Sequence, residues 1–465
     1  MMRQIRPAMA HTTGRTGTRS GTPGPRGTAR RQWAVDVCGA LAGAGLGVSI
    51  GSVLVTQTRG SLSAAGGLAT AAGELAGLTG AYLLLIMVLL IARLPWLELS
   101  VGQARLIGWH RRVAPWAFGL ICAHVLFITL GYAQSAGVNV VRQTWVFITN
   151  YPDLLAAVSG FGLLVLAVIT SVRLVRARLR YETWWVVHLY TYIALALAFA
   201  HQIVTGAAFV GHPLARAAWI VIWALTAGLV LAFRIVQPIM RSIRHRLRVV
   251  EIREEVPGVF SLICQGRKLD QLAVSGGQFF LWRFLTRQLW WQAHPYSLSA
   301  LPQPPYLRVT IEGVGDQGQA VRALRPGTRI AIEGPYGALT PRARVAERVL
   351  LIGAGVGITP LRALLEDLPP STDVTVIIRA SAAAQLLHHE EIAALVERCG
   401  GRLHEIVGPR DQVRLDAAAL RELVPDVARR DVYICGPDGF IADMTDAALR
   451  LGVAEAQIHQ EAFGF

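Results

Sequence analysis

The sequence predicts a six-helix transmembrane bundle, followed by an antiparallel β-barrel domain and an α/β domain with a parallel sheet. Three patterns predict this fold class. The first half carries apolar segments of about twenty residues, the length that spans a bilayer. The middle alternates apolar and polar residues between Gly and Pro turns, and the last quarter repeats strand, turn and helix patterns. With 53% hydrophobic and 16% charged residues, the 465-residue chain is too apolar for an ordinary soluble protein.

Residues 1–32 are expected to form a disordered, basic cytoplasmic tail. The segment is rich in Gly, Thr, Pro and Arg and holds too few apolar residues to bury a core. A signal peptide is the alternative, but the basic stretch before the first apolar run is long for one. We therefore expect the tail to precede a helix that is retained.

The six apolar segments are the predicted membrane spans. Arginines gather before the first span, between the second and third, between the fourth and fifth, and after the sixth, whereas the alternate loops hold only Arg59 and Arg142. By the positive-inside bias, both termini and the whole region after the last span lie in the cytoplasm of a multi-pass plasma-membrane protein. The spans are expected at about 33–55, 75–93, 110–133, 153–173, 184–205 and 213–236.

Charge and cysteine content exclude several classes of function. The 45 Lys and Arg residues exceed the 30 Asp and Glu, but the arginines flank apolar segments and form no basic patch with interleaved aromatic residues. Nucleic-acid binding is therefore not expected. The five cysteines include no CxxC pair, which excludes a zinc ribbon and a plant-type iron–sulfur module. The expected partners are the lipid bilayer and small molecules, with the oligomeric state left open.

Four of the twelve histidines lie inside predicted spans, where an ionisable side chain is costly and usually functional. His110 and His124 in the third span are 14 residues apart, about 21 Å along a helix and within roughly 40° of one face. His188 and His201 in the fifth span are 13 apart, about 19.5 Å. An ideal helix puts this second pair on different faces, so their use together needs local overwinding or a favourable approach of the ligand.

The assigned topology pairs these histidines by depth in the membrane. His110 lies level with His188 near the cytoplasmic face, and His124 lies level with His201 near the outer face. Each level can supply two imidazoles to one haem iron, and bis-His ligation suits electron transfer. A zinc site would need its ligands at one level. The histidines therefore predict two haems stacked across the membrane.

Short motifs in the second half indicate a flavin and a nicotinamide cofactor. A Tyr followed by a hydroxyl residue can cover a flavin ring, and "HPYSLS" supplies His294, Pro295, Tyr296, Ser297, Leu298 and Ser299. The Gly-bearing turn "GPYG" could admit a diphosphate and contains Gly334, Pro335, Tyr336 and Gly337.

A second Gly-rich turn follows an apolar strand and opens a helix, the context in which a helix N-terminus favours a phosphate. This turn, "GAGVGITP", contains Gly353, Ala354, Gly355, Val356, Gly357, Thr359 and Pro360. Further on, "YICGPDGF" places Cys435, Gly436 and Pro437 after another strand, and "HQEAFGF" follows with Glu461 and Phe465.

In combination, order and spacing, these features resemble the NADPH oxidase and ferric reductase family over about residues 75–465. The resemblance implies that His110, His124, His188 and His201 ligate two b-type haems. It implies that the "HPYSLS" and "GPYG" residues contact FAD, and that Gly353–Pro360, with Gly436 and Pro437, hold the nicotinamide cofactor. Cys435, Glu461 and Phe465 would then flank the site of hydride transfer, with Phe465 occupying the nicotinamide's place until displaced.

The resemblance also implies a division of the chain into domains. The chain departs from the family's pattern at two points. The transmembrane domain is expected at 33–240, the FAD barrel at 245–341 and the nucleotide domain at 346–465. Phe440 stands where the family usually has Met, and no calcium-binding EF-hand extension is present. Arg379 ends the second strand of the last domain, where an Arg can pair with a 2′-phosphate, so NADPH is favoured over NADH.

These residues predict an NAD(P)H oxidase or ferric reductase. Electrons would pass from NAD(P)H through FAD and the haems to an external acceptor, either oxygen, giving superoxide, or a ferric chelate. A membrane-anchored flavin reductase serving a partner protein is the alternative, but it would not need two levels of histidine pairs. A transport module would need charged residues along a path, whereas the span interiors hold His and almost no Asp or Glu.

Overall fold

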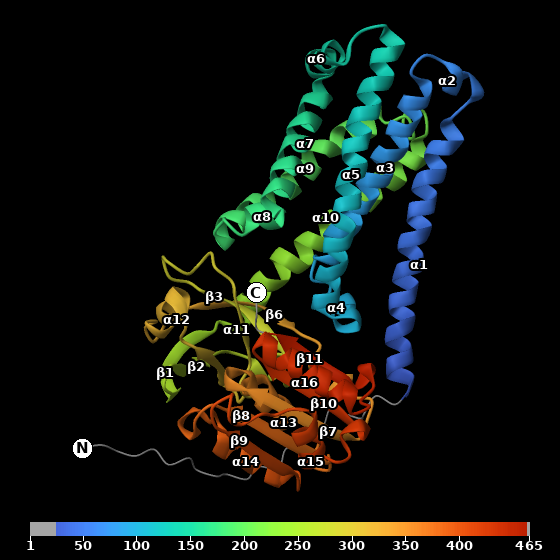
Figure 1. The fold of residues 1–465 in the computed structure, drawn as a ribbon. Coiled ribbons are helices and arrows are strands. Elements are labelled where there is room, and N and C mark those ends of the chain that lie inside the picture. The colour runs from blue at the N-terminus through green and yellow to red at the C-terminus, as the bar shows by residue number, and fades with distance from the viewer. Residues whose placement is uncertain (1–24, 463–465) are drawn as a thin grey trace.

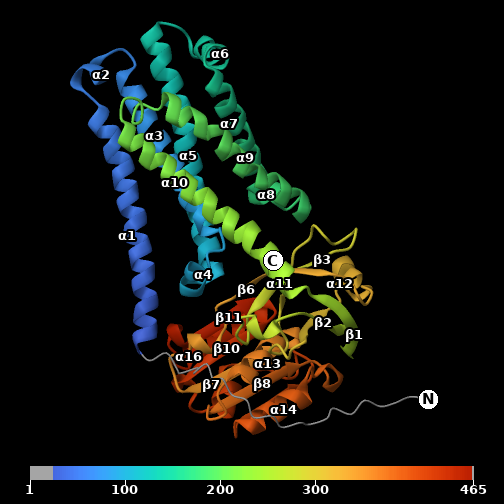
Figure 2. The same ribbon diagram turned by 180° about the vertical axis from the view of Figure 1, so that it is seen from behind.

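The computed structural model describes residues 25–462. Long helices from the first half of the chain form a bundle that stands on a module of strands and shorter helices from the second half (Figures 1 and 2). Residues 1–24 of the predicted tail lie outside the described residues. Residues 25–32 are helical, which corrects the predicted end of that tail. Pro25 at the first helical position has the φ angle that a helix start requires.

Six of the described helices are long and apolar enough to cross a membrane, which confirms the six predicted spans. The second and third begin earlier than predicted, because residues 67–74 and 103–109, ahead of the predicted spans, are also helical. Glu74 lies inside α3 and accepts a hydrogen bond from Gln57. The long helices are α1 (Pro25–Thr56), α3 (Gly67–Leu90), α5 (Gln103–Ala136), α7 (Pro152–Ser171), α9 (Tyr181–Thr205) and α10 (Pro213–Leu231).

Shorter helices connect the long ones at both ends of the bundle. Figure 1 shows α2 and α6 at the end far from the module, and α4, α8 and α11 at the end that faces it. The arginine-rich connections are therefore on the module's side. α6 was not predicted, although Asn139 caps it by accepting a hydrogen bond from the Arg142 N–H at 2.8 Å. The short elements are α2 (Arg59–Ser63), α4 (Pro95–Val101), α6 (Val140–Asn150), α8 (Arg173–Arg176), the π-helical turn η1 (Ala232–Val236) and α11 (Gln237–His245).

Glycines allow the histidine-bearing helices to pack closely against their neighbours. A Cβ at Gly73 of α3 would lie 2.8 Å from the backbone nitrogen of Ile128 in α5. A Cβ at Gly160 of α7 would lie 2.7 Å from the carbonyl oxygen of Ala194 in α9. Larger side chains would push each pair apart, so these small residues set the close helix spacing that is common in membrane bundles.

Two antiparallel three-stranded sheets follow the bundle, with strand orders β1-β2-β5 and β4-β3-β6. Isolated bridges join the sheets at both edges, from Arg248 to Arg329 and from Leu298 to Val309. Apolar side chains from both sheets, among them the fully buried Trp282, share one core. The elements are β1 (Arg248–Val256), β2 (Val259–Gln265), β3 (Phe279–Phe284), β4 (His294–Ser297), β5 (Tyr306–Glu312), α12 (Gly315–Arg322) and β6 (Ile330–Tyr336).

The last part of the chain forms the predicted parallel sheet, with strand order β11-β10-β7-β8-β9. Side chains of α13 and α14 pack on one face and those of α15 and α16 on the other, so the strands are buried on both sides. The elements are β7 (Arg348–Ala354), α13 (Ile358–Asp367), β8 (Val374–Ala380), α14 (His389–Arg398), β9 (Arg402–Val407), α15 (Ala417–Leu423), β10 (Arg430–Gly436), α16 (Asp438–Arg450) and β11 (Ile458–Ala462).

Candidate functional site

The structure brings the four span histidines together in the two predicted pairs. The ring centroids of His110 in α5 and His188 in α9 lie 6.3 Å apart, with the rings inclined at 70°. Those of His124 and His201, further from the module, also lie 6.3 Å apart, with the rings inclined at 37°. Because α9 is a regular α-helix from Tyr181 to Thr205, the 13-residue spacing needs no overwinding, and the approach of the helices alone allows both pairs.

Hydrogen bonds hold three of the four rings through their Nδ1 atoms. Nδ1 of His110 lies 3.3 Å from the Met87 carbonyl oxygen, and Nδ1 of His124 lies 2.8 Å from that of Gly73. Nδ1 of His188 lies 3.4 Å from Oγ of Ser171. A metal-ligating histidine characteristically uses its second ring nitrogen in this way. These contacts leave Nε2 of the three rings for a ligand.

His201 differs from the other three histidines. Its Nδ1 is buried and has no hydrogen-bond partner among the residues that the structure describes. A buried polar atom of this kind is costly unless a ligand or water satisfies it. Thr205, one turn along α9, donates instead to the backbone carbonyl of His201 at 2.7 Å.

The end of the bundle that holds His110 and His188 touches the module through charged and aromatic side chains. The guanidinium of Arg93, between α3 and α4, lies 4.2 Å from the ring centroid of Tyr336 and pairs with Glu98 at 2.7 Å. Arg234 in η1 pairs with Glu333 of β6 at 2.8 Å, and Glu333 accepts a hydrogen bond from the Tyr336 hydroxyl at 2.7 Å. "GPYG" was predicted as a turn, but Gly334, Pro335 and Tyr336 end strand β6, and this strand is in direct contact with the bundle.

The predicted flavin strand, β4, is buried beside aromatic side chains. The rings of His294 and Tyr296 are stacked, with centroids 5.8 Å apart and planes inclined at 6°. Burial raises the pKa of Tyr296 to about 12 and, with the charge of Arg283, lowers the pKa of His294. Nε2 of His294 and Oγ of Ser299 are buried without hydrogen-bond partners. Both atoms are available to a ligand at the ends of this motif.

Gly337 brings the end of β6 close to β11. It has a φ of +98°, and a Cβ there would lie 3.1 Å from Oε1 of Glu461. Glu461 is paired in register with Cys435 of β10. Burial, and secondly the charge of Glu98 from α4, raise the pKa of Glu461 to about 8. Among residues 25–462, its Oε2 has no hydrogen-bond partner. The carboxyl group is therefore largely protonated at neutral pH.

Cys435 lies next to this carboxyl group at the end of β10 and is completely buried. Burial, and then the nearby Glu461, raise the pKa of its thiol, so it is not a reactive thiolate. Gly436 and Pro437 follow and lead into α16, with Phe440 buried in the core of that face. The predicted partner Phe465 lies outside the described residues.

The predicted nucleotide turn connects β7 to α13 through the short 3-10 turn η4 (Gly355–Gly357). A Cβ at Gly357 would lie 2.6 Å from the backbone of Cys435, so the turn packs directly on the end of β10. Gly355, with a φ of +55°, has no atom within 4 Å of the place a Cβ would take. Thr359 donates to the carbonyl of Val356 at 2.8 Å. The backbone ahead of α13 is thus open at Gly355 and close-packed at Gly357.

Arg379 ends β8, where it was predicted to meet a 2′-phosphate. Its guanidinium donates to the carbonyl oxygens of Ala380, of Ile406 at 3.3 Å and of Val413 at 3.1 Å. The side chain is buried in these contacts. A phosphate at this position would have to replace one or more of the carbonyl partners.

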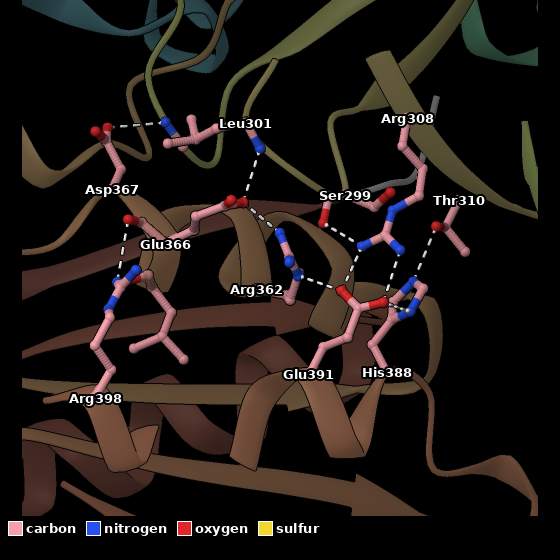
Figure 3. A network of polar contacts seen from close by, with 12 residues as sticks. Ser299, Leu301, Arg308, Thr310, Arg362, Glu366, Asp367, His388, Glu391 and Arg398 are labelled. Carbon is pink, nitrogen blue, oxygen red and sulfur yellow. Dashed lines mark hydrogen bonds and ion pairs between the residues drawn. The ribbon is translucent and has the colours of Figure 1, made fainter. Parts of the chain in front are cut away.

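A polar network that the sequence did not predict joins the antiparallel sheets to the nucleotide domain (Figure 3). Arg308 of β5 makes two hydrogen bonds of 2.7 Å to the carboxylate of Glu391 in α14, which also meets Nε of Arg362 in α13 at 2.9 Å. Burial alone would raise the pKa of Glu391, but Arg308 and Arg362 more than offset this and lower it to about 2. Nε2 of His388 lies 3.0 Å from Oγ1 of Thr310.

Two carboxylates of α13 extend this network by binding backbone N–H groups of the neighbouring sheets. Glu366 accepts from Leu301 at 2.9 Å, and Asp367 accepts from Gly276 at 3.0 Å. These contacts fix β4 and its loop relative to the turn before α13. Sequence reasoning missed the network because the hydrogen bonds that join the antiparallel sheets to the nucleotide domain connect residues 65 to 91 positions apart, and nothing near either partner signals the other.

Two family models match the chain. Residues 76–199 match the ferric reductase like transmembrane component, and residues 351–446 match the oxidoreductase NAD-binding domain. The chain joins a ferric-reductase-like transmembrane domain to an oxidoreductase NAD-binding domain. It is therefore a membrane oxidoreductase, and the predicted family resemblance is confirmed at the level of these two domains.

Curated relatives match the module of this membrane oxidoreductase. An NADPH oxidoreductase of Mycobacterium tuberculosis is 27% identical over 183 residues, which cover 37% of this chain and 48% of that protein. The glycine betaine monooxygenase reductase subunit of Chromohalobacter salexigens is 24% identical over 240 residues, covering 48% of this chain and 64% of that protein. A flavohemoprotein of Vibrio cholerae is 32% identical over 184 residues, covering 36% of this chain and 46% of that protein. The chain thus spans about half to two thirds of these relatives.

Solved structures also match the module of the membrane oxidoreductase. The flavohem-like FAD/NAD binding domain of nitric oxide dioxygenase from Vibrio cholerae O1 biovar El Tor has 24% identity and a TM-score of 0.39. The match covers 47% of this chain and 99% of that one. A ferredoxin NADP+ reductase from Neisseria gonorrhoeae with bound FAD and NADP has 17% identity and a TM-score of 0.42, with coverage of 48% and 99%.

Proposed function

We propose that this membrane oxidoreductase carries electrons from cytoplasmic NAD(P)H, through FAD and two b-type haems, to an acceptor outside the cell. The transmembrane domain, 33–240, would hold the haems. The two antiparallel sheets, 245–341, would form the FAD barrel, and 346–465 would bind NAD(P)H. The arginine-rich connections on the module's side of the bundle support a cytoplasmic module.

The matching geometry of the two imidazole pairs carries this proposal. Each pair would offer one imidazole from α5 and one from α9 to one haem. Both pairs have a ring-centroid separation of 6.3 Å. The two levels lie on the same two helices and have the same spacing, so both would hold the same kind of ligand.

The surroundings of the pairs also fit the binding of haem by these histidines. The Nδ1 contacts of His110, His124 and His188 leave Nε2 for iron, and the orphaned Nδ1 of His201 marks a site that lacks a partner. Within residues 25–462, no group of three or more His, Cys, Asp or Glu side chains is placed to hold a metal ion. Pairs without further protein ligands suit a metal whose remaining ligands come from a porphyrin.

The module supplies groups that fit a flavin and a nicotinamide cofactor. The unpartnered Nε2 of His294 and Oγ of Ser299 would hydrogen-bond FAD along β4, next to Tyr296 and Ser297. The open backbone at Gly355 and the N-terminus of α13 would receive the phosphates of NAD(P)H. When bound, FAD would accept a hydride from NAD(P)H and release electrons singly, and the haems would carry them across the membrane.

Residues of the chain would position these groups and hold a proton. Tyr336, clamped between Arg93 of the bundle and Glu333 of its own strand, would hold the flavin edge against the end of the bundle that carries His110. Glu461, with a pKa of about 8, would keep a proton beside Cys435 at the site of hydride transfer. Phe465 keeps its predicted role of covering the nicotinamide's place.

The nicotinamide donor and the external electron acceptor are proposed from two different parts of the chain. NADPH is proposed ahead of NADH because Arg379 lies at the end of β8, although its carbonyl partners would have to give way to the 2′-phosphate. His124 and His201 would hold a haem at the end of the bundle far from the module, so oxygen, giving superoxide, or a ferric chelate would accept electrons at that end.

Haem content tests the proposal. Full-length protein purified into nanodiscs should contain two haems per chain, and His124→Leu should contain one while retaining FAD. His404→Leu, in β9 of the nucleotide domain, serves as the matched control and should retain both haems. Equal haem content in the wild type and His124→Leu would contradict the proposed ligand.

The acceptor is tested separately with the same preparation. Superoxide formation in air, measured by its dismutase-sensitive reduction of cytochrome c, would support oxygen as the acceptor. Reduction of a ferric chelate under nitrogen, at a rate matching NADPH oxidation, would support ferric iron. NADPH oxidation that leaves the haems oxidised would favour the membrane-anchored flavin reductase instead.

A further inference from the structure

A cleft of about 570 Å³ lies between α11 and the outer side of the sheet β4-β3-β6, where the bundle meets the module. Its polar lining comes from segments that are far apart in the sequence. None of the residues predicted to bind FAD or NAD(P)H lines it. The charged side chains in the lining are Arg234, Arg246, Arg248, Arg283, Arg329 and Glu333.

The cleft carries unneutralised positive charge. Within residues 25–462, only one of its five arginines, Arg234, pairs with a carboxylate, that of Glu333 at 2.8 Å. Arg248 and Arg329 are both exposed and lie opposite each other across an antiparallel bridge. Like charges in that position are destabilising. Arg246 and Arg283 donate only to the carbonyls of Ile243 and Trp291, which leaves their charge in place.

One wall of the same cleft is apolar. Ile235, Ile239 and Ile243 follow one another at four-residue intervals, lie on one face of η1 and α11, and are 49%, 52% and 55% exposed. This row continues from α10, the last part of the bundle before the module. A row of exposed isoleucines next to arginines suits a ligand with an anionic head and a hydrocarbon chain.

The position of the cleft matches a membrane surface. The sixth candidate span, Pro213–His245, includes α11, so the arginines lie where the span leaves the bilayer. The connection after β3 presents two exposed apolar residues, Leu285 at 49% and Trp290 at 61%, on the neighbouring surface. Tryptophan favours the boundary between lipid and water. Figure 2 shows α11 at this junction, between α10 and the strands.

We propose that this cleft binds an anionic phospholipid from the leaflet on the module's side of the membrane. The arginines would hold the phosphate headgroup, and the row of Ile235, Ile239 and Ile243 would lie along one acyl chain. Since α11 and β6 form opposite walls, the bound lipid would connect the bundle to the module. The proposal rests on the proposed membrane placement of the bundle and not on the path of the electrons.

Lipid binding to the full-length protein in neutral detergent tests this site. Native mass spectrometry would follow titration with phosphatidylglycerol and, separately, with phosphatidylcholine. Arg248→Gln combined with Arg329→Gln removes two exposed charges from the cleft, and Arg414→Gln combined with Arg421→Gln removes two exposed charges from the nucleotide domain as the matched control. Because the cleft variant loses two basic residues that would face an anionic headgroup, it should bind phosphatidylglycerol at least about tenfold more weakly.

Each further outcome bears on the assignment. The proposal is supported if the control variant binds phosphatidylglycerol as tightly as the wild type does. It is also supported if the affinity for phosphatidylcholine is the same in the wild type and the cleft variant. Equal phosphatidylglycerol affinity in the wild type and the cleft variant overturns it. Displacement of the lipid by millimolar inorganic phosphate overturns it in favour of a free-anion site. Loss of FAD from the cleft variant, with lipid affinity unchanged, overturns it in favour of the flavin. None of these readouts requires electron transfer, so failure of the proposed function is detected independently by haem content.

Discussion

Gly77→Ala is expected to weaken the outer haem site without touching a ligand. A Cβ at this position in α3 would lie 2.3 Å from Nδ1 of His124. The ring would have to retreat by roughly 1 Å to restore ordinary contact, which breaks its 2.8 Å hydrogen bond to the Gly73 carbonyl. Overpacking of this kind costs about 1–3 kcal/mol. The cost applies when haem fixes the ring, so haem affinity at this level should fall roughly five- to 150-fold.

The assay for this change is haem titration with a matched control. Alanine also raises helix propensity by about 1 kcal/mol, but this gain is the same with and without haem. Gly119→Ala, in α5, introduces the same methyl group where no atom lies within 4 Å and should leave both haems bound. The His110–His188 level should keep its haem in both variants. Two haems bound to Gly77→Ala with wild-type affinity would refute the reasoning.

Three further predictions concern the module. Glu391→Gln removes a carboxyl group whose pKa is lowered to about 2, so the wild type should lose more stability than the variant as the pH falls from 4.5 through 2. Because its pair with Arg308 is partly exposed, the loss at neutral pH should be about 1 kcal/mol or less in thermal unfolding. Glu461→Gln removes a group with a pKa of about 8, so stopped-flow reduction of the flavin by NADPH should lose its dependence on pH near 8. Gly357→Ala places a Cβ 2.6 Å from the backbone of β10 and should raise KM for NADPH about tenfold with haem content unchanged. Gly439→Ala, where the nearest atom is 3.9 Å away, should behave as wild type.

The membrane half was predictable because its signals are local and strong. Six long apolar runs fix the spans, and four histidines in those runs stand out because charged and polar groups are rare there. The positions of helix ends were less predictable, since Gly, Ala and Thr ahead of α3 neither favour nor forbid a helix. His188 and His201 lie on one regular helix, and each meets a histidine of α5 only because of how α5 and α9 approach each other, which a periodicity argument does not contain.

The module was predictable in its motifs but not in its contacts. The strand–turn–helix around Gly355 follows from its neighbours in the sequence, and the structure has it where expected. The ion pair between Arg308 and Glu391 joins residues 83 positions apart, and nothing near either one signals it. The contact of Arg93 with Tyr336 likewise depends on how the bundle meets the sheets. Arg379 lies at the end of β8 as expected, but the sequence did not predict that backbone carbonyl oxygens would hold its guanidinium.

The most direct test of transmembrane electron transfer is an absorption difference spectrum of the full-length protein in nanodiscs, recorded anaerobically before and after addition of NADPH. The account predicts b-type haem bands that NADPH alone reduces, at half the amplitude in His124→Leu. A flavin that NADPH reduces in a protein without haem bands, or haem bands that only dithionite reduces, would contradict it.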